Sequence, residues 1–152
     1  MSTADRFLGA AIWQARRGLR ERGIPIGAAL VIDDVVVGIG RNRRVQRGSA
    51  ILHAEIDCLR NAGRLSPQDY RRATLYSTLS PCDMCSGAIL LFGIPTVVVG
   101  EARTFTGPEG YLRSRGVEIH VMDDPACKAL MDAFLADDAN ASLWKEDIGS
   151  LV

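Results

Sequence analysis

The stretch TLYSTLSPCDMCSGAILLFGIPTVVVG, from Thr74 to Gly100, decides the fold of this 152-residue chain. Thr74–Thr78 is a short β-type run, and Leu79-Ser80-Pro81 turns the chain into a helix that we expect from Cys82 to Phe92. A Gly and a Pro then end that helix, and the unbroken apolar run 96–100 predicts a strand buried on both faces. The stretch therefore predicts a central sheet that is covered by helices.

The flanking sequence adds helices and strands to this unit. Leu8, Ile12, Ala15 and Leu19 recur at helical spacing and predict an amphipathic first helix from Ala4 to about Arg20. The other expected elements are strands at Ala28–Ile32 and Val35–Gly40 joined at Asp33-Asp34, a polar loop from Arg41 to Ser49, a helix from His53 to Ala62 ended by Gly63, a strand at Glu118–Val121, a helix with an inward stripe of Cys127, Met131 and Phe134, and a short terminal segment from Ser142 to Gly149.

Strands that alternate with helices after an initial hairpin predict an α/β fold, a three-layer α/β/α domain with a mixed sheet. The length fits one domain over residues 1–152, and the sequence contains no internal repeat, linker or low-complexity tract. Because 18 Lys and Arg balance 18 Asp and Glu, the formal net charge is zero, which disfavours a nucleic-acid partner. The absence of a signal-like start or an apolar run of membrane length leads us to expect a cytoplasmic protein with no membrane partner.

Two motifs carry candidate chemistry. His53-Ala54-Glu55 opens one expected helix, while Cys82 and Cys85 open another, behind Ser80 as cap and Pro81 as first helical residue. A catalytic zinc site takes three protein ligands and leaves one position for water. His53 and the two cysteines form such a set, and the positive helix end together with the metal favours bound thiolates. We expect the two helix starts to face each other at one edge of the sheet.

Glu55 lies two residues after His53 and is a candidate catalytic residue, because a carboxylate beside an activated water can move protons to a leaving nitrogen. The alternative is a closed structural zinc site or no metal, since a lone C-x-x-C also fits redox chemistry or packing. A closed site needs a fourth ligand, and neither Cys58 nor Cys127 has a partner at ligand spacing. These two cysteines are expected to be reduced and buried. The combination of H-x-E with P-C-x-x-C is typical of zinc-dependent deaminases.

The chain resembles the cytidine/deoxycytidylate deaminase-like zinc hydrolases, and within them most closely the fungal-type cytosine deaminases. The resemblance extends from about Gly23 to Gly149 and so covers nearly the whole chain. Besides the zinc motifs, the similar segments are Pro25–Gly27, Gly40–Asn42, Gly48–Ala50, Asn61–Leu65, Thr78–Cys85, Gly93–Pro95, Val99–Glu101, Tyr111-Leu112 with Arg115-Gly116, and Glu146–Gly149.

The resemblance implies a cytidine-deaminase-like fold with five strands, a homodimer, and hydrolysis of the free base cytosine to uracil and ammonia, as in pyrimidine salvage. It also implies one Zn2+ per subunit, held by His53, Cys82 and Cys85, with Glu55 as proton shuttle. For substrate binding it implies that Asn42 and the backbone N–H of Ala54 bond the O2 side of the ring, that Asp147 meets the exocyclic amine, that Phe105 and Trp144 close over the base, and that Ile26, Leu79 and Ser80 line the pocket.

Each pocket residue also has a purely structural alternative. Asn42 can support a turn, aromatic residues such as Phe105 and Trp144 are most often core, and Asp147 can be a solvated carboxylate. The arginines between 41 and 47 are expected to form a solvated loop face, and His120 to be exposed.

Three positions depart from the fungal pattern. Ala54, Asp57 and Lys145 stand where that pattern has Gly, Ser and Phe. Asp57 either approaches the pocket or points away from it, and Lys145 removes an apolar neighbour of Trp144. These departures put the identity of the substrate in question more than the reaction class.

Other functions remain open at this point. The same chemistry fits another cyclic amidine such as creatinine, guanine or a pterin, although the set of pocket residues favours cytosine. A tRNA adenosine deaminase shares the zinc motifs, but zero net charge argues against an RNA-binding surface. A nucleoside deaminase needs partners for ribose, which nothing in the sequence identifies. A zinc-stabilised scaffold without catalysis has no need of Glu55.

Overall fold

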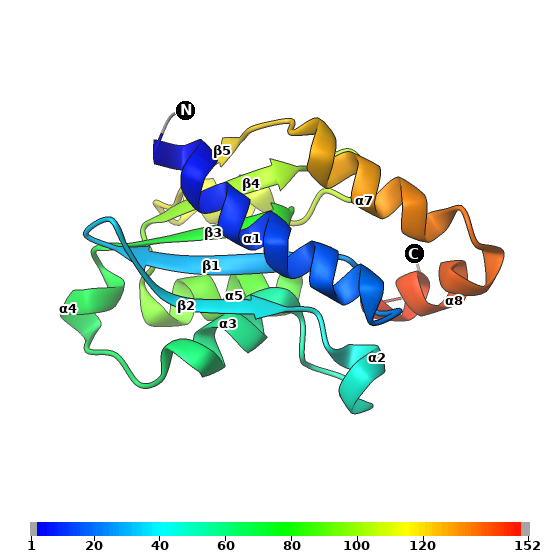
Figure 1. Cartoon of the computed structure of the whole chain (residues 1–152). Helices are drawn as coiled ribbons and strands as arrows, with labels where there is room; N and C mark the ends of the chain where they lie inside the picture. Colours follow the sequence, from blue (N-terminus) through cyan, green and yellow to red (C-terminus); the bar gives the residue numbers. More distant parts are fainter. Residues whose placement is uncertain (1–2, 150–152) are drawn as a thin grey trace.

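A computed structural model of the chain, which describes residues 3–149, shows a five-stranded mixed sheet between two layers of helices (Figure 1). The strands lie in the order β2-β1-β3-β4-β5, with β1 antiparallel to both of its neighbours and β3, β4 and β5 parallel. Their bounds are β1 Gly27–Ile32, β2 Val35–Arg41, β3 Ala73–Leu79, β4 Thr96–Glu101 and β5 Glu118–Val121. The predicted α/β class and the mixed sheet are confirmed.

The helices cover both faces of the sheet. Helices α1 (Thr3–Arg20) and α7 (Pro125–Leu135) contact each other and pack on one face, whereas α3 (Ala54–Ala62) and α5 (Asp83–Phe92) pack on the other. The α3 and α5 face carries the candidate metal ligands. The shorter helices are α2 Arg44–Arg47, α4 Pro67–Tyr70, α6 Glu109–Ser114 and α8 Asp138–Asp147.

The side chains of β1 alternate between two apolar cores, as a strand buried on both faces requires. Ala28, Leu30 and Ile32 join the larger core beneath α3 and α5, whereas Ala29 and Val31 pack with α1. All six residues of this strand are buried. The alternation fixes the strand register, because a slip by one residue would exchange the two faces.

Strand β2 and helix α3 are in close contact. Gly40 permits this contact, because a Cβ atom there would overlap the backbone of Cys58 in α3. The hairpin that joins β1 to β2 turns at Asp33 and Asp34, whose φ angles of 50° and 62° are those of a type I′ turn. The expected turn position is therefore confirmed.

Several local predictions were wrong. Residues 41–49 are not simply a loop, because Arg41 ends β2 and Arg44–Arg47 form the short helix α2. Helix α5 begins at Asp83 with Cys82 as its N-cap, so Pro81 is not its first residue. Helices α4 and α6 were not predicted. The terminal segment is part of α8, which begins earlier than expected. Asp137 is the N-cap of this helix, and its side chain accepts a hydrogen bond from the Ala139 N–H.

Within residues 3–149, the structure contains no helix that is long and apolar enough to cross a membrane.

Candidate active site

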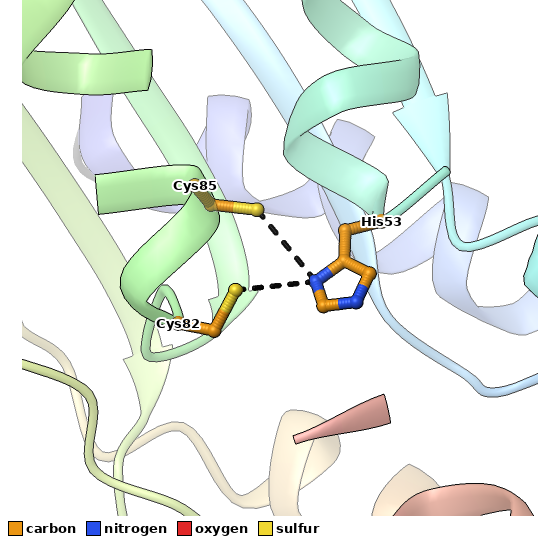
Figure 2. A group of neighbouring side chains, drawn as sticks. All are labelled: His53, Cys82 and Cys85. Atoms are coloured by element: carbon orange, nitrogen blue, oxygen red, sulfur yellow. Dashed lines mark hydrogen bonds between the residues drawn. The ribbon is translucent and has the colours of Figure 1, made fainter. Parts of the chain in front are cut away.

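Two helix starts on the same face of the sheet present the candidate metal ligands. His53 is the N-cap residue of α3, and Cys82 is the N-cap residue of α5, which follows β3 after a short turn. Cys85 lies in the first turn of α5 and is fully buried. Figure 2 shows both sulfur atoms directed toward the His53 imidazole. The expectation that two facing helix starts carry these side chains is therefore confirmed.

The spacing of the three donor atoms fits a tetrahedral zinc ion. The Cys82 Sγ lies 3.3 Å and the Cys85 Sγ 3.7 Å from His53 Nδ1. Zinc bonds of about 2.3 Å to sulfur and about 2.1 Å to nitrogen place such atoms roughly 3.6 Å apart. In the described part of the chain, no fourth His, Cys, Asp or Glu ligand atom joins this group. The donor set thus matches an open three-ligand site.

The electrostatics of the cluster favour a cysteine thiolate. The hydrogen bond from the Cys85 thiol lowers the pKa of Cys82 to about 4, and His53 acts in the same direction. Cys85, as the donor in that hydrogen bond, has a raised pKa. For His53, burial lowers the pKa, but Cys82 and Asp147 outweigh burial and raise the pKa to about 9. A negatively charged sulfur beside an imidazole suits the binding of a divalent cation.

Glu55 lies in the first turn of α3 and reaches the same cavity. Its side chain is buried, and no described Arg or Lys side chain forms an ion pair with it. Burial raises the pKa of Glu55 to about 7, although the nearby His53 opposes this shift. A carboxyl group with a pKa near neutrality can both accept and release a proton, which suits general acid and base chemistry.

The cavity beside the cluster is small, with a volume of about 20 Å³. That volume is enough for about one water molecule. All the candidate site residues named from the sequence line it except Cys85, which is fully buried. Its lining is Ile26, Asn42, His53, Ala54, Glu55, Leu79, Ser80, Cys82, Phe105, Trp144, Asp147 and Ile148.

A polar network fixes one wall of the cavity. The amide nitrogen of Asn42 donates to both carboxylate oxygens of Asp147, at 3.2 and 3.3 Å. The amide oxygen of Asn42 accepts the N–H of Arg44, so its partners assign the orientation of the amide. Asp147 Oδ1 also lies 3.1 Å from the Arg44 guanidinium and 3.4 Å from His53 Nε2. Asn42 and Asp147 are therefore held as one unit, although 105 residues separate them.

Two aromatic rings line the cavity. Phe105 and Trp144 meet edge to face with ring centroids 6.1 Å apart. The loop that carries Phe105 is anchored to the start of α5, because the Ser80 hydroxyl donates to Glu109 at 2.5 Å and accepts the N–H of Gly107. These bonds occupy the Ser80 hydroxyl, so it neither caps α5 nor points freely into the cavity. The sequence prediction of Ser80 as the cap of α5 was wrong for this reason.

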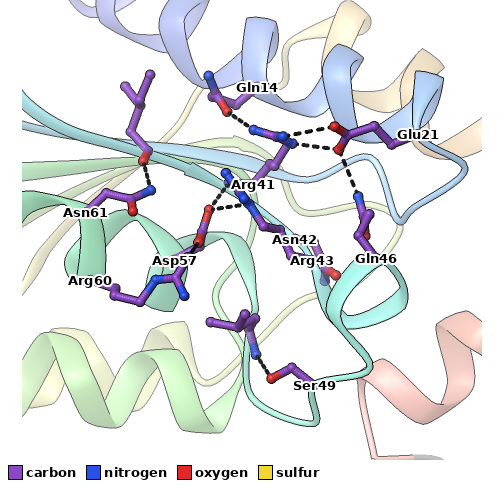
Figure 3. Close-up of polar contacts among 12 residues, drawn as sticks. Gln14, Glu21, Arg41, Asn42, Arg43, Gln46, Ser49, Asp57, Arg60 and Asn61 are labelled. Carbon is purple, nitrogen blue, oxygen red and sulfur yellow. Dashed lines mark hydrogen bonds and ion pairs between the residues drawn. The ribbon is translucent and has the colours of Figure 1, made fainter.

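The arginines between 41 and 47 are not a solvated face, contrary to prediction. Arg41 is buried and its guanidinium donates to both carboxylate oxygens of Glu21 and to Gln14 (Figure 3). Arg43 pairs with Asp57, and Arg44 pairs with Asp147; Arg47 alone is exposed as expected. The partners come from distant segments, which local sequence patterns do not reveal.

Asp57 points away from the cavity. Its carboxylate accepts the backbone N–H of Arg41 and pairs with Arg43 at 3.1 Å and with Arg60 at 2.9 Å (Figure 3). The side chain is fully buried and does not line the cavity. Lys145 is exposed and likewise does not line the cavity. Neither departure from the fungal pattern therefore places a new group in the cavity.

Sequence reasoning missed three residues around the cavity. Ile148 lines it, Arg44 fixes one wall, and Glu109 anchors the aromatic loop. A signal existed only for Ile148, which adjoins the candidate Asp147. Other expectations for single side chains are confirmed: His120 is exposed, and Cys58 and Cys127 are buried free cysteines.

The geometry can be compared with known proteins. Residues 1–101 match the family described as the cytidine and deoxycytidylate deaminase zinc-binding region. The chain is 47% identical over 143 residues to a cytosine deaminase from Candida albicans, an alignment that covers 93% of this chain and 94% of that protein. The similarity therefore extends over nearly the full length of both chains.

More distant relatives include proteins described as acting on other substrates. A tRNA-specific adenosine deaminase from Streptococcus pyogenes is 38% identical over 98 residues, which cover 63% of this chain and 61% of that protein. The solved structure of a guanine deaminase from Nitrosomonas europaea superimposes with a TM-score of 0.71, covering 86% of this chain and 84% of that one. At 24% identity, this structural similarity establishes the shared fold alone.

Proposed function

The chain belongs to the cytidine and deoxycytidylate deaminase zinc-binding family and is a deaminase, and we propose that its substrate is the free base cytosine, which it hydrolyses to uracil and ammonia. One observation carries the choice of substrate. A small cavity lined by two aromatic rings combines the Asn42 and Asp147 pair with Glu55 and the cluster of His53 and the two cysteines. Such a cavity offers flat surfaces to a planar base and polar groups to its edge.

We propose that His53, Cys82 and Cys85 hold one zinc ion per subunit. The spacing of their donor atoms and the lowered pKa of Cys82 support this assignment. Zinc bound there supplies a Lewis acid that lowers the pKa of a water molecule. The lack of a fourth ligand among residues 3–149 favours a catalytic site over a closed structural one.

In the proposed reaction, Glu55 moves two protons. Its carboxylate first accepts a proton from water as the oxygen bonds to C4 of cytosine, and it passes that proton to ring nitrogen N3. Glu55 then accepts the remaining hydroxyl proton and delivers it to the amine. The bond between C4 and the amine breaks, ammonia leaves, and the C4 carbonyl of uracil forms. A pKa near 7 makes both forms of Glu55 accessible.

We propose that Asn42 and Asp147, in the polar wall of the cavity, form hydrogen bonds to the edge of the base. The Asn42 amide nitrogen has a second hydrogen for the O2 carbonyl, beside the backbone N–H of Ala54, while Asp147 accepts from the exocyclic amine. Phe105 and Trp144 cover the faces of the ring, and Ile26 and Leu79 complete the apolar lining. Ser80 contributes through the anchoring of the Phe105 loop.

We propose that the enzyme is one domain over residues 1–152 and a homodimer; residues 1–2 and 150–152 lie outside the described part. Helices α5 and α6 present apolar side chains to solvent, and Leu91 and Tyr111 are 78% and 54% exposed. Exposed apolar side chains gathered on neighbouring helices suit contact between subunits. Sedimentation equilibrium is expected to give a dimer, and Leu91→Glu a monomer; a monomeric wild-type chain would contradict this.

We also propose a cytoplasmic location and a role in pyrimidine salvage. Two ligand thiols and two buried free cysteines suit a reducing compartment, where disulfides are rare. No nucleic-acid partner is proposed, because the formal net charge is zero, whereas proteins that bind nucleic acids are usually basic.

The test of the proposed substrate is ammonia release by the zinc-loaded chain with cytosine, cytidine, guanine, creatinine and a pterin measured in parallel. We expect turnover of cytosine and loss of that turnover in Glu55→Gln. Turnover of another amidine in place of cytosine would keep the chemistry and overturn the proposed substrate. Wild-type activity in Glu55→Gln would overturn the proposed catalytic role and favour a scaffold.

A further inference from the structure

Arg44 connects both members of the polar wall, and it lies outside the set of pocket residues implied by the family resemblance. Its backbone N–H donates to the Asn42 amide oxygen, and its guanidinium pairs with Asp147 Oδ1 at 3.1 Å. Its Nε donates to the backbone oxygen of Ala50 at 3.1 Å. The side chain is only 18% exposed, so water competes weakly for these contacts.

The two oxygens of Asp147 have different surroundings. Oδ1 lies within 3.4 Å of nitrogen atoms from Asn42, Arg44 and His53. Among residues 3–149, the polar partner of Oδ2 is the Asn42 amide nitrogen, at 3.3 Å. A carboxylate oxygen accepts about two hydrogen bonds, so Oδ2 retains capacity for a donor in the cavity whereas Oδ1 does not.

The negative charge of Asp147 needs a nearby cation to stabilise it. Asp147 is the last residue of α8, where the carbonyl ends of the helix create a negative potential that disfavours a carboxylate. The adjacent Glu146 adds a second acidic group, and its side chain is exposed. Arg44 is the described Arg or Lys side chain that pairs with Asp147.

We propose that Arg44 is a positioning residue that holds Asp147 with Oδ2 toward the cavity, and that this arrangement makes the site prefer an amino substrate to its oxo product. The inference rests on the proposed function, in which the exocyclic amine of cytosine faces Asp147. An amine donates to Oδ2. The carbonyl that replaces the amine in uracil is itself an acceptor, so two acceptors then face each other without a shared hydrogen. Arg44 thereby assists both substrate binding and product release.

The experiment compares cytosine and uracil binding by calorimetry in a zinc-loaded Glu55→Gln chain, which holds cytosine without turning it over. Adding Arg44→Gln is expected to weaken cytosine binding about tenfold or more while uracil binding changes less, so the ratio of the two Kd values falls. Arg44→Lys is expected to restore part of the ratio, because a cation again faces Oδ1. Arg47→Gln, an exposed arginine of the same helix α2, is the matched control and is expected to change neither Kd.

A purely structural role of Arg44 in joining α2 to α8 predicts another result. Loosening of α8 would weaken the binding of cytosine and the binding of uracil equally. An unchanged ratio of the two Kd values in Arg44→Gln would therefore overturn the inference. A ratio of the two Kd values that is as low in Arg44→Lys as in Arg44→Gln would also contradict the inference, provided that both variants fold. Thermal unfolding would show whether they do. If the chain with Glu55 intact releases no ammonia from cytosine, the proposed function itself fails, which is a separate outcome.

Discussion

The two carboxylates of α3, Glu55 and Asp57, lie two residues apart and are both buried, yet their surroundings are opposite. Asp57 faces the interior network of Figure 3, where it meets Arg43, Arg60 and the backbone N–H of Arg41. Glu55 faces the cavity, where no described Arg or Lys pairs with it, and burial raises its pKa to about 7. Burial is common to both, so the partners distinguish a structural carboxylate from a reactive one.

The same contrast separates two regions on either side of Asn42. In the network behind it, Arg41 binds Glu21 and Gln14, and Asp57 accepts two hydrogen bonds and forms an ion pair with Arg43, so the carboxylates have charged partners. In the cavity before it, Glu55 and Asp147 Oδ2 keep free capacity for a ligand. Satisfied charges hold the wall in place, and unsatisfied ones are available for substrate. Substitutions in the first region should therefore lower stability, and those in the second should lower activity.

The largest effect is expected for Glu55→Gln. Loss of the proton carrier should lower kcat by about 10²–10⁴-fold. The midpoint of thermal unfolding should stay the same or rise, because a neutral amide costs less to bury than a carboxylate. Steady-state kinetics and calorimetry on the same preparation check both expectations. Residual activity above a tenth of the wild-type value would refute the assignment of Glu55.

Asp57→Asn is expected to have the opposite profile. The substitution replaces the fully buried carboxylate by a neutral amide, so Arg43 loses its charged partner. The free energy of unfolding should fall by about 2–3 kcal/mol. Urea denaturation measures the loss, and kcat of the folded fraction should remain within a few-fold of wild type. Asp33→Asn, which removes an exposed pair with Arg72, serves as control and should change stability by less than about 1 kcal/mol. Equal losses in the two variants would contradict the contrast.

Glu109→Ala tests the anchor of the aromatic loop. Removal of the acceptor for the Ser80 hydroxyl should loosen the loop that carries Phe105, at a cost of about 1 kcal/mol. We expect KM for cytosine to rise severalfold, with a smaller change in kcat. Glu109→Gln keeps an acceptor oxygen for Ser80 and should lie close to wild type. An unchanged KM in the alanine variant would show that the loop is positioned without this bond.

The smallest effect, dependent on pH, is expected for Glu21→Gln. Hydrogen bonding from Arg41 lowers the pKa of Glu21 to about 2 from its usual 4.5. The folded state therefore binds the proton less readily than the unfolded state, and the resulting stabilisation is present above pH 4.5 and lost as the pH falls toward 2. Because the Glu21 side chain is 37% exposed, the difference from wild type should be about 1 kcal/mol at pH 6. Urea denaturation at pH 6 and pH 3 should show the gap shrinking; a gap independent of pH would contradict the ion pair.

Much of the fold could be predicted because long elements repeat their apolar residues. The apolar run 96–100 became β4, the stripe beginning at Leu8 became α1, and Gly63 ends α3 as expected. Helices α2, α4 and α6, with 4 to 6 residues, are too short to show a helical period. The start of α5 shifted because Ser80 bonds to Glu109, a partner 29 residues away.

The metal cluster could be predicted from spacing, whereas the wall of the cavity could not. The sequence pattern formed by His53, Cys82 and Cys85 indicates zinc binding without any knowledge of the fold. Asn42 and Asp147 are ordinary residues until the fold brings them into contact, and only resemblance to a family pointed to them. The arginines show the limit most clearly, because Arg41 and Arg44 look like a solvated run until Glu21 and Asp147 supply their partners.

The most direct test of the central claim is product analysis of cytosine incubated with the zinc-loaded chain in ¹⁸O-labelled water. The account predicts equal amounts of uracil and ammonia, one ¹⁸O atom in each uracil, and at least about a hundredfold less of both products over the same time with Glu55→Gln. Absence of uracil from the wild-type reaction, or uracil that carries no label, would contradict the claim that this cavity hydrolyses the free base.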